Sequence, residues 1–327
     1  MKLVITLCLF ATLVGCGRAQ TTTSVEESIP DYMLGPIVLS PDNEGAIIYE
    51  IKNYHDLDHV FDSLDFQTED VFGDLKTVPR MYTVRITERW ADSTVKEIDV
   101  HTKKGLFVQA LLPLALASNE LIMQDRQGIV ALQQKPWNSL RQYEIDWIQR
   151  EAVFYEAIKE DEKVDSLVFD DLLTRMDVIP VSLVLSQTAL ESGWGTSRFT
   201  SEGNSLFGQM AWGKNVMTPA GQDEKHGNRG LKVYGTLIES VQSYMHNLNS
   251  HYAYEEFRAR RAEMRDSTQS LDGKLLAESL IKYSTRGEEY VKHVLSMMRS
   301  NDFSKYDNVS LAQGEEIYLI PVAGDGN

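Results

Sequence analysis

Cysteine is scarce in this sequence. Of 327 residues only Cys8 and Cys16 are cysteines, and Cys8 lies in a segment that we expect to be removed from the mature chain. One remaining thiol excludes an internal disulfide and a cysteine-based zinc site. Stability must therefore come from packing, and a hydrophobic content of 43%, with five Trp and fourteen Tyr, is enough for one large domain and a smaller one.

Several motifs of well-understood chemistry are also missing. The chain has no HExxH, no paired CxxC, no P-loop and no GxSxG elbow, so we expect no metal, no nucleotide and no other cofactor. His55 and His59 flank acidic residues and could suggest a metal site. A solvated, acidic start of a helix is the favoured interpretation, because no third ligand is evident.

Positive charge is in the minority. Lys and Arg number 32 against 48 Asp and Glu, for a formal charge of −16, which makes nucleic acid an unsuitable partner. The same balance gives no general attraction to an anionic cell wall, so any wall binding must be local. Beyond the first residues we expect no run long and apolar enough to cross a membrane, and we expect a monomer.

The chain opens with the layout of a secretory signal. Lys2 gives a positive start, and Leu3–Val14 is an apolar run too short to span a bilayer. The ending Leu13-Val14-Gly15-Cys16 resembles the lipobox of bacterial lipoproteins. An ordinary signal peptide with a chance cysteine is the alternative.

The lipobox resemblance implies a membrane anchor. Residues 1–15 would be the lipoprotein signal peptide, Cys16 the acylated first residue, and residues 16–35 a flexible tether. Gly17, rather than Asp, follows the cysteine. By the sorting rule for such lipoproteins, this favours the periplasmic side of the outer membrane.

The rest of the chain divides by composition. Residues 36–102 mix short β-type runs, at 36–39 and 46–51, with turn residues, and predict an accessory region of unassigned role. Helical spacing of apolar residues begins at about residue 103 and is interrupted at 200–236 by a Gly-rich, polar segment. That segment holds one possible strand at 231–234.

One stretch carries the candidate chemistry. Pro180 suits the first turn of a helix, and Gly193 favours its end, which places Glu191 in the last turn. The negative end of the helix dipole and water exclusion by Trp194 would both raise the pKa of Glu191, as a general acid requires. From physics alone, an exposed terminal glutamate is the favoured alternative.

A resemblance to a known family favours the general-acid interpretation of Glu191 over the exposed-residue alternative. The string Ala189-Leu190-Glu191-Ser192-Gly193-Trp194-Gly195, followed by Ser197-Arg198 and by Gly203-Asn204-Ser205-Leu206-Phe207-Gly208, resembles the core of bacterial endo-β-N-acetylglucosaminidases. Further segments, at 112–114, 179–183, 240–249 and 283–290, are similar to its Bax-type branch. The resemblance implies an α+β, mainly α fold: a lysozyme-like helical body with a small Gly-rich β-lobe, here as a catalytic domain at 103–306 between the accessory region and a polar tail at 307–327.

The resemblance also implies roles. Glu191 would be the general acid for cutting β-1,4 bonds after N-acetylglucosamine in peptidoglycan strands, with Tyr283 beside the scissile sugar. From its helical spacing alone, Tyr283 is equally a core residue. For the second carboxylate, Asp223 and Glu224 are available and Glu224 is preferred; failing both, the substrate's acetamido group would act as nucleophile.

Aromatic and polar neighbours complete the predicted site. Trp194 and Phe207 are as readily hinge core as sugar platforms, and Asn204 more readily shapes its loop than touches substrate. The predicted substrate-binding residues are Ser192, Trp194, Asn204, Phe207, Trp212, Tyr234 and Tyr290.

Three other functions stay open at this point. A lytic transglycosylase shares the lysozyme-like fold and a single acidic residue but leaves an anhydro sugar. A wall-binding lipoprotein with a degenerate cleft would need no catalyst. The family's naming also includes release of N-glycans from glycoproteins.

Overall fold

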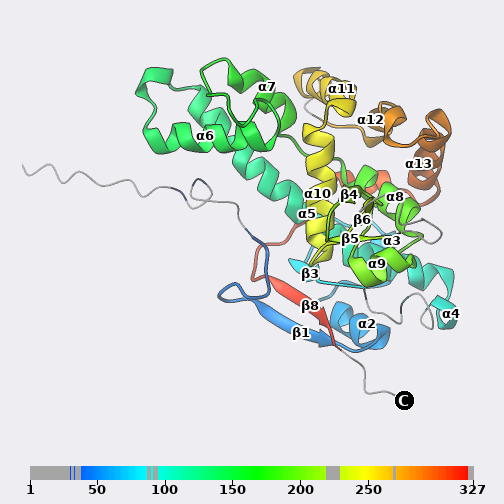
Figure 1. Cartoon of the computed structure of the whole chain (residues 1–327). Coiled ribbons are helices and arrows are strands. Elements are labelled where there is room, and N and C mark those ends of the chain that lie inside the picture. Colours follow the sequence, from blue (N-terminus) through cyan, green and yellow to red (C-terminus); the bar gives the residue numbers. More distant parts are fainter. Residues whose placement is uncertain are drawn as a thin grey trace, which may run out of the picture.

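The structure, a computed structural model, describes residues 30, 33, 38–86, 90, 95–218, 229–267 and 270–322. The predicted signal, most of the tether, Cys16, Asp223 and Glu224 lie outside these residues, whereas Met33 of the tether is buried in a hydrophobic cluster with Trp147. The protein is mainly α with three small sheets, which confirms the predicted fold class (Figure 1). The helices are α2 (Tyr54–Ser63), α3 (Thr68–Phe72), α4 (Val95–Glu97), α5 (Val100–Gln133), α6 (Gln142–Phe154), α7 (Val168–Arg175), α8 (Val181–Ser192), α9 (Arg198–Gly203), α10 (Leu237–Ser250), α11 (Glu255–Ser267), α12 (Gly273–Ala277) and α13 (Glu288–Ser300). The strands are β1 (Ile47–Ile51), β2 (Thr77–Val78), β3 (Met81–Thr83), β4 (Met210–Trp212), β5 (Val216–Met217), β6 (Arg229–Lys232), β7 (Ser310–Leu311) and β8 (Ile317–Pro321).

Helix α5 is the central element of the body. Asp99 caps its first turn by accepting hydrogen bonds from the backbone N–H groups of His101 and Thr102. By length and composition α5 could cross a membrane, so the expectation that no later stretch could do so is wrong. Yet 72% of its most apolar window is buried inside the protein. Such burial is typical of a core helix, because the apolar surface is already covered by other helices.

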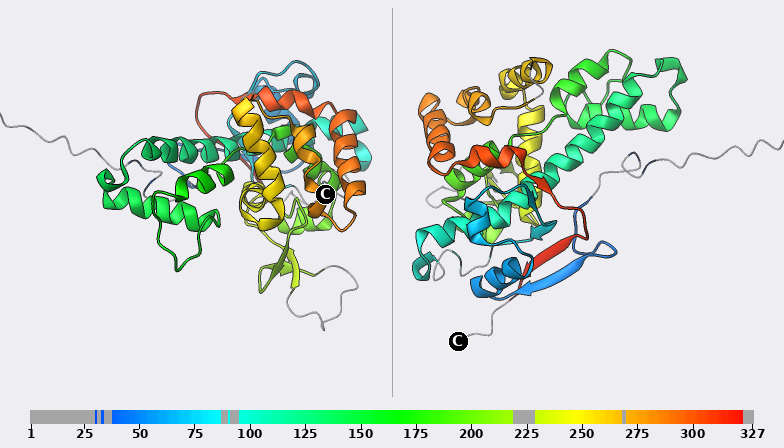
Figure 2. Two further views of the ribbon diagram at one scale, coloured as in Figure 1. Left: turned by 90° about the horizontal axis from the view of Figure 1, so that it is seen from above. Right: turned by 180° about the vertical axis from the view of Figure 1, so that it is seen from behind.

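The accessory region is not a separate unit. Strand β8 lies between β1 and β3 in a parallel sheet, with Ile48 opposite Tyr318 and Met81 opposite Ile317. The short apolar piece at 318–322, which the sequence shows within the predicted polar tail, therefore supplies most of the central strand of the accessory sheet, and its Tyr318 and Leu319 are core residues. Figure 2 shows β1 and β8 side by side in its right-hand view. The predicted boundary between 102 and 103 falls inside α5, which shares one hydrophobic core with this sheet.

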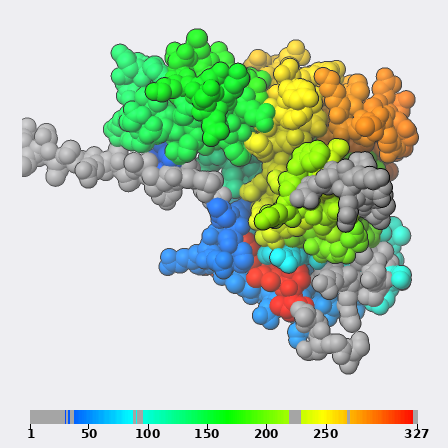
Figure 3. Space-filling view, in the orientation of Figure 1, coloured from blue at the N-terminus to red at the C-terminus, as the bar shows by residue number. Residues whose placement is uncertain are grey.

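Two further parts project from the body. Helices α6 and α7 build a lobe of their own around the buried indole of Trp147, and this lobe stands out at the upper left of Figure 3. Strands β4, β6 and β5 form the antiparallel Gly-rich lobe, which protrudes in the left view of Figure 2. The predicted strand at 231–234 corresponds to β6. A side chain at Gly230 would stand 2.6 Å from the Met217 carbonyl oxygen, so glycine permits this close pairing.

Candidate active site

Helix α8 positions the candidate acid as the sequence predicts. It starts directly after Pro180 and ends at Gly193, which adopts the left-handed conformation with φ 58°. Glu191 therefore lies in the last turn, at the negative end of the helix dipole. Almost every other residue of α8 is buried, so the helix is held on all sides and its C-terminal end is fixed in place.

The turn after α8 is braced by the accessory region. Gly195 has φ 79°, and a side chain there would lie 2.8 Å from Ile86 Cδ1 and 3.0 Å from Trp90 Nε1. The indole N–H of Trp90 donates to the Trp194 carbonyl at 3.0 Å. This gives the accessory region a role that its composition does not reveal: it fixes the turn that follows Glu191.

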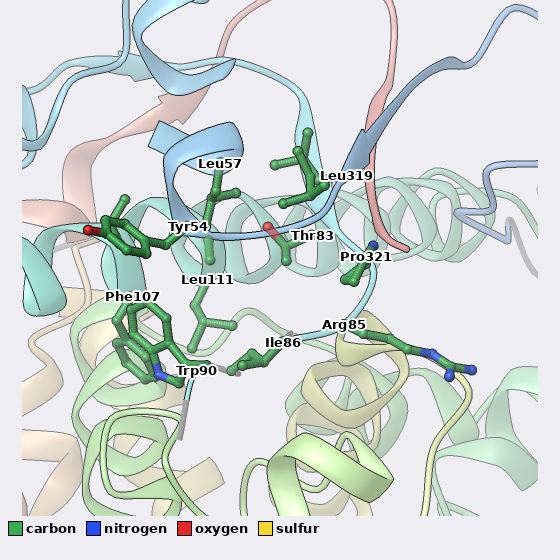
Figure 4. Close-up of a pocket in the computed structure, with 13 residues that line it drawn as sticks. Tyr54, Leu57, Thr83, Arg85, Ile86, Trp90, Phe107, Leu111, Leu319 and Pro321 are labelled. Carbon is green, nitrogen blue, oxygen red and sulfur yellow. The ribbon is translucent and has the colours of Figure 1, made fainter. Parts of the chain in front are cut away.

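A small apolar cavity lies beside this brace (Figure 4). Its volume is about 30 Å³, which is room for about one water molecule and far too little for a sugar ring. The rings of Trp90 and Phe107 close one side, while the Arg85 side chain extends away from it. Glu191 does not line this cavity, so we interpret it as a packing gap under the accessory sheet rather than as a substrate site.

The Glu191 carboxyl group is reachable from solvent yet flanked by protein. Burial by its neighbours raises its pKa above the ordinary value for glutamate, and the Tyr290 hydroxyl and the Arg286 guanidinium oppose that shift. The net direction is the one that the sequence predicts for a general acid.

A chain of buried hydrogen bonds supports Glu191 from behind. The Tyr244 hydroxyl donates to Gln187 Oε1 at 2.5 Å, and Gln187 Nε2 donates to the Tyr290 hydroxyl at 2.7 Å. Because the Tyr290 oxygen already accepts from Gln187, its own proton is directed to Glu191, its remaining partner. All three residues of this relay are buried, so the direction of donation is fixed by packing.

Tyr283 joins the same aromatic cluster. Its ring stacks on that of Tyr290, with centroids 5.2 Å apart and planes at 10°, and its hydroxyl reaches the Phe207 carbonyl at 3.5 Å. Phe207 in turn stacks on Tyr244 at 4.0 Å. Burial raises the pKa of Tyr283 well above its ordinary value, so its hydroxyl keeps its proton and can only donate or accept a hydrogen bond.

Three predicted sugar contacts have packing roles instead. Tyr290 is only 2% exposed and acts on Glu191 rather than on a sugar face. The Ser192 hydroxyl is buried, where it donates to the Thr188 carbonyl and accepts from the Gly195 N–H. Trp194 packs against α5 at Phe107, which is the hinge-core alternative that its sequence context left open.

The predicted contacts in and near the β-lobe likewise include residues with packing roles and one exposed ring. Asn204, with φ 50°, donates to the carbonyls of Tyr234 and Gly235, and so ties its loop to the start of α10, as the loop-shaping interpretation predicts. The Tyr234 hydroxyl is occupied by Gln209 and Ser243. Trp212 is 72% exposed on β4, and of the predicted aromatic residues it is the one whose face is most available to a sugar.

Sequence reasoning missed Gln187, Tyr244 and Arg286. Gln187 had a usable signal: its side chain is the largest polar one in the stretch before Glu191, and it lies one helical turn before Glu191 and therefore on the same face. Tyr244 and Arg286 gave no such signal, because only the folded chain brings α10 and the start of α13 to the end of α8.

Comparison with known proteins shows what this chain is similar to. Residues 167–303 match the family described as mannosyl-glycoprotein endo-beta-N-acetylglucosaminidase. The chain is also 29% identical over 205 residues to protein bax of Escherichia coli (strain K12), across 61% of this chain and 70% of that protein. Residues 167–303 therefore carry a glucosaminidase-type domain, and the chain is similar to a Bax-named protein. The family domain makes it a glycosidase, and so a hydrolase. No solved structure matches it.

The family match covers the helix end and the turn that carry Glu191. Glu191, Gln187, Tyr244, Tyr283 and Tyr290 all lie inside residues 167–303. The accessory strands β1 and β3 and the central strand β8 lie outside that segment. The brace from Trp90 is therefore a contribution of this chain from beyond the matched domain.

Proposed function

We propose that this protein hydrolyses the β-1,4 bond after N-acetylglucosamine in peptidoglycan, with Glu191 as general acid. The observation that carries the proposal is the position of Glu191: at the accessible end of a rigid helix, with a raised pKa and one directed donor behind it. A protonated carboxyl group at such a place can give its hydrogen to a leaving glycosidic oxygen.

The surroundings suit both states of the acid. Partial burial favours the protonated form before reaction. Once the proton has gone, Tyr290 donates to the new carboxylate and Arg286 attracts it, so the charge is not left isolated. Tyr283, stacked beside Tyr290, is placed to hold a water or an acetamido group near the same carboxyl.

A second catalytic carboxylate has to come from elsewhere. Among the described residues, no other carboxylate acts on the pKa of Glu191. Retaining and inverting hydrolases both need a second carboxylate within roughly 10 Å. Glu224, outside the described residues, stays our prediction for this role, with the substrate's acetamido group as the alternative.

The test is product analysis of purified peptidoglycan digested by the soluble protein. We expect mass spectrometry to find reducing-end N-acetylglucosamine. Anhydromuramic ends would identify a lytic transglycosylase, which the single carboxyl group near Tyr290 would also suit. Absence of any new end would leave a wall-binding protein without activity and would contradict the proposal.

The cellular place of the protein is part of the proposal. The lipobox-like Cys16 supports a lipid anchor facing the periplasm from the outer membrane, where the domain would reach the wall on its tether. Metabolic labelling with a fatty acid probe should mark the wild type and not Cys16→Ala. A labelled Cys16→Ala variant would contradict the anchor without touching the catalytic proposal.

A further inference from the structure

A second cavity lies where the α6–α7 lobe meets the body. Its volume is about 400 Å³, within the range of small-ligand sites. Helices α5, α6 and α10 contribute its walls, and none of its residues is among those that contact Glu191. In Figure 1 this junction lies where α6 approaches α10.

The walls combine apolar surface with two carboxyl groups. Leu121 and Ile122 supply aliphatic surface from α5, and Asp125 follows on the same helix. Glu151 faces them from α6, close enough for Asp125 to act on its charge. Asp125 has no hydrogen bond or ion pair among the described residues, so its carboxylate is available to a ligand.

Three aromatic rings line the opposite part of the cavity. Phe154 lies 4.2 Å from His246 and 5.1 Å from Tyr155 between ring centroids. The His246 Nε2–H donates to the Phe154 carbonyl at 2.6 Å, which fixes the imidazole and joins α10 to α6. Aromatic faces attract cations, and they do so more strongly where water is excluded.

Tyr155 points independently to a missing ligand. The residue is only 4% exposed, yet its hydroxyl has no hydrogen-bond partner within the described part of the chain. It lines the cavity together with the two carboxyl groups, and both of them raise its pKa. The hydroxyl opens on the cavity, so a donor bound there would give it a hydrogen-bond partner.

The charges select the ligand class. The one guanidinium in the lining belongs to Arg150, which donates to the Met33 carbonyl and lowers the pKa of Glu151. Two carboxyl groups face this one cation, so when both are ionised the lining carries a net negative charge, which disfavours an anion. Among the described residues no group of three potential ligands suits a metal ion.

We propose that this cavity binds a primary ammonium ion carried on an aliphatic stem. The N–H donors would reach Asp125, Glu151 and the Tyr155 hydroxyl, while the stem would lie on Leu121 and Ile122. A quaternary ammonium would satisfy the aromatic rings but would offer no N–H donor to Asp125, to the Tyr155 hydroxyl or to the remaining acceptor capacity of Glu151. The inference does not depend on the glycosidase activity.

Binding of n-pentylammonium to the protein with methyl-labelled Leu and Ile tests the site by NMR. We expect saturable shifts of the Leu121 and Ile122 methyl signals, and at least tenfold weaker binding to Asp125→Asn/Glu151→Gln. The matched control, Asp146→Asn/Asp161→Asn, changes the net charge equally at exposed positions of the same lobe and should bind like the wild type. Tyr155→Phe should bind several-fold more weakly.

The remaining outcomes decide against the site or identify its source. No saturable shift in the wild type, equal binding by the cavity double variant, or equal binding of tetramethylammonium would overturn the proposal. Binding of Nα-acetyl-lysine amide more tightly than pentylammonium would support a peptide side chain as the ligand. Weaker binding of that amide would support a free amine.

Discussion

Two of the places where this protein holds carboxyl groups with raised pKa values differ in whether a second carboxyl group adds to the shift. At the end of α8, burial raises the pKa of Glu191 while Tyr290 and Arg286 lower it. Between α5 and α6, burial raises the pKa of Asp125 to about 6 and that of Glu151 to about 7, and Asp125 adds to the shift of Glu151.

The two sites are therefore suited to different tasks. Glu191 can release a proton, whereas the Asp125–Glu151 pair can bind a positively charged ligand. Glu191 has a fixed donor and a cation that stabilise its charge after proton transfer, so it can cycle between both states. Arg150 and a hydrogen bond from Trp147 oppose the shift of Glu151, but among the described residues no cation opposes that of Asp125. Such a pair is stable when protonated or when a positive ligand neutralises it.

The largest expected effect comes from removing the acid. Glu191→Gln keeps the shape and removes the transferable proton, so kcat on peptidoglycan should fall by on the order of 10²- to 10⁴-fold. Binding to insoluble wall should persist. Glu202→Gln, an exposed carboxylate on nearby α9, serves as the control and should keep its rate. A Glu191→Gln variant with wild-type turnover would end the assignment of Glu191 as the acid.

The next largest expected effect is on the free energy of unfolding, and it concerns the Asp125–Glu151 pair. The folded-state pKa values of Asp125 and Glu151 exceed their unfolded values, so their contribution is fully present below about pH 4 and is lost as pH rises to about 7. Asp125→Asn/Glu151→Gln should therefore unfold at higher denaturant at about pH 8, by on the order of 2 kcal/mol. At about pH 4 the gain should vanish, and a gain independent of pH would contradict the shifted values.

A smaller effect should follow from breaking the relay at Tyr290. Tyr290→Phe removes a donor that lowers the pKa of Glu191, so the alkaline limb of kcat/KM should move to higher pH. The rate should also fall about tenfold, because the carboxylate formed loses a hydrogen bond. Tyr318→Phe, which removes a hydroxyl in the β1–β8–β3 sheet, should leave the pH profile in place. An unchanged pH profile of kcat/KM in Tyr290→Phe would show that the hydrogen-bond relay does not affect catalysis.

The smallest expected effect concerns the brace. Trp90→Phe removes the hydrogen bond to the Trp194 carbonyl and should lower the free energy of unfolding by about 1 kcal/mol. The turn after Glu191 should loosen with it, which hydrogen exchange at Gly195 and Thr196 would report. Unchanged exchange there would show that the accessory region supports the fold without supporting the turn.

The sequence predicts the first carboxyl site better than the second for a physical reason. Pro180, Glu191 and Gly193 act within one helix, so helix-ending rules and a contiguous family motif locate them. Tyr244 and Arg286 reach Glu191 only through packing of other helices. Asp125 and Glu151 belong to two helices joined by a loop, and neither has a local motif that marks it.

The fold follows the same division. The helical body and the strand at β1 follow from periodicity and turn residues. The place of β8 between β1 and β3 does not, because a short apolar piece near the end of the chain carries no sign of which distant strands it will pair with. The long apolar window of α5 likewise shows its role only when the surrounding helices are seen.

The most direct test of the account is a titration of the Glu191 side chain, followed by ¹³C NMR of its carboxyl carbon, beside the pH dependence of kcat/KM. The account predicts that the carboxyl loses its proton above the ordinary pH for glutamate and that activity declines over the same interval. A Glu191 that titrates at or below its ordinary value, or activity that persists after it has ionised, would contradict the account.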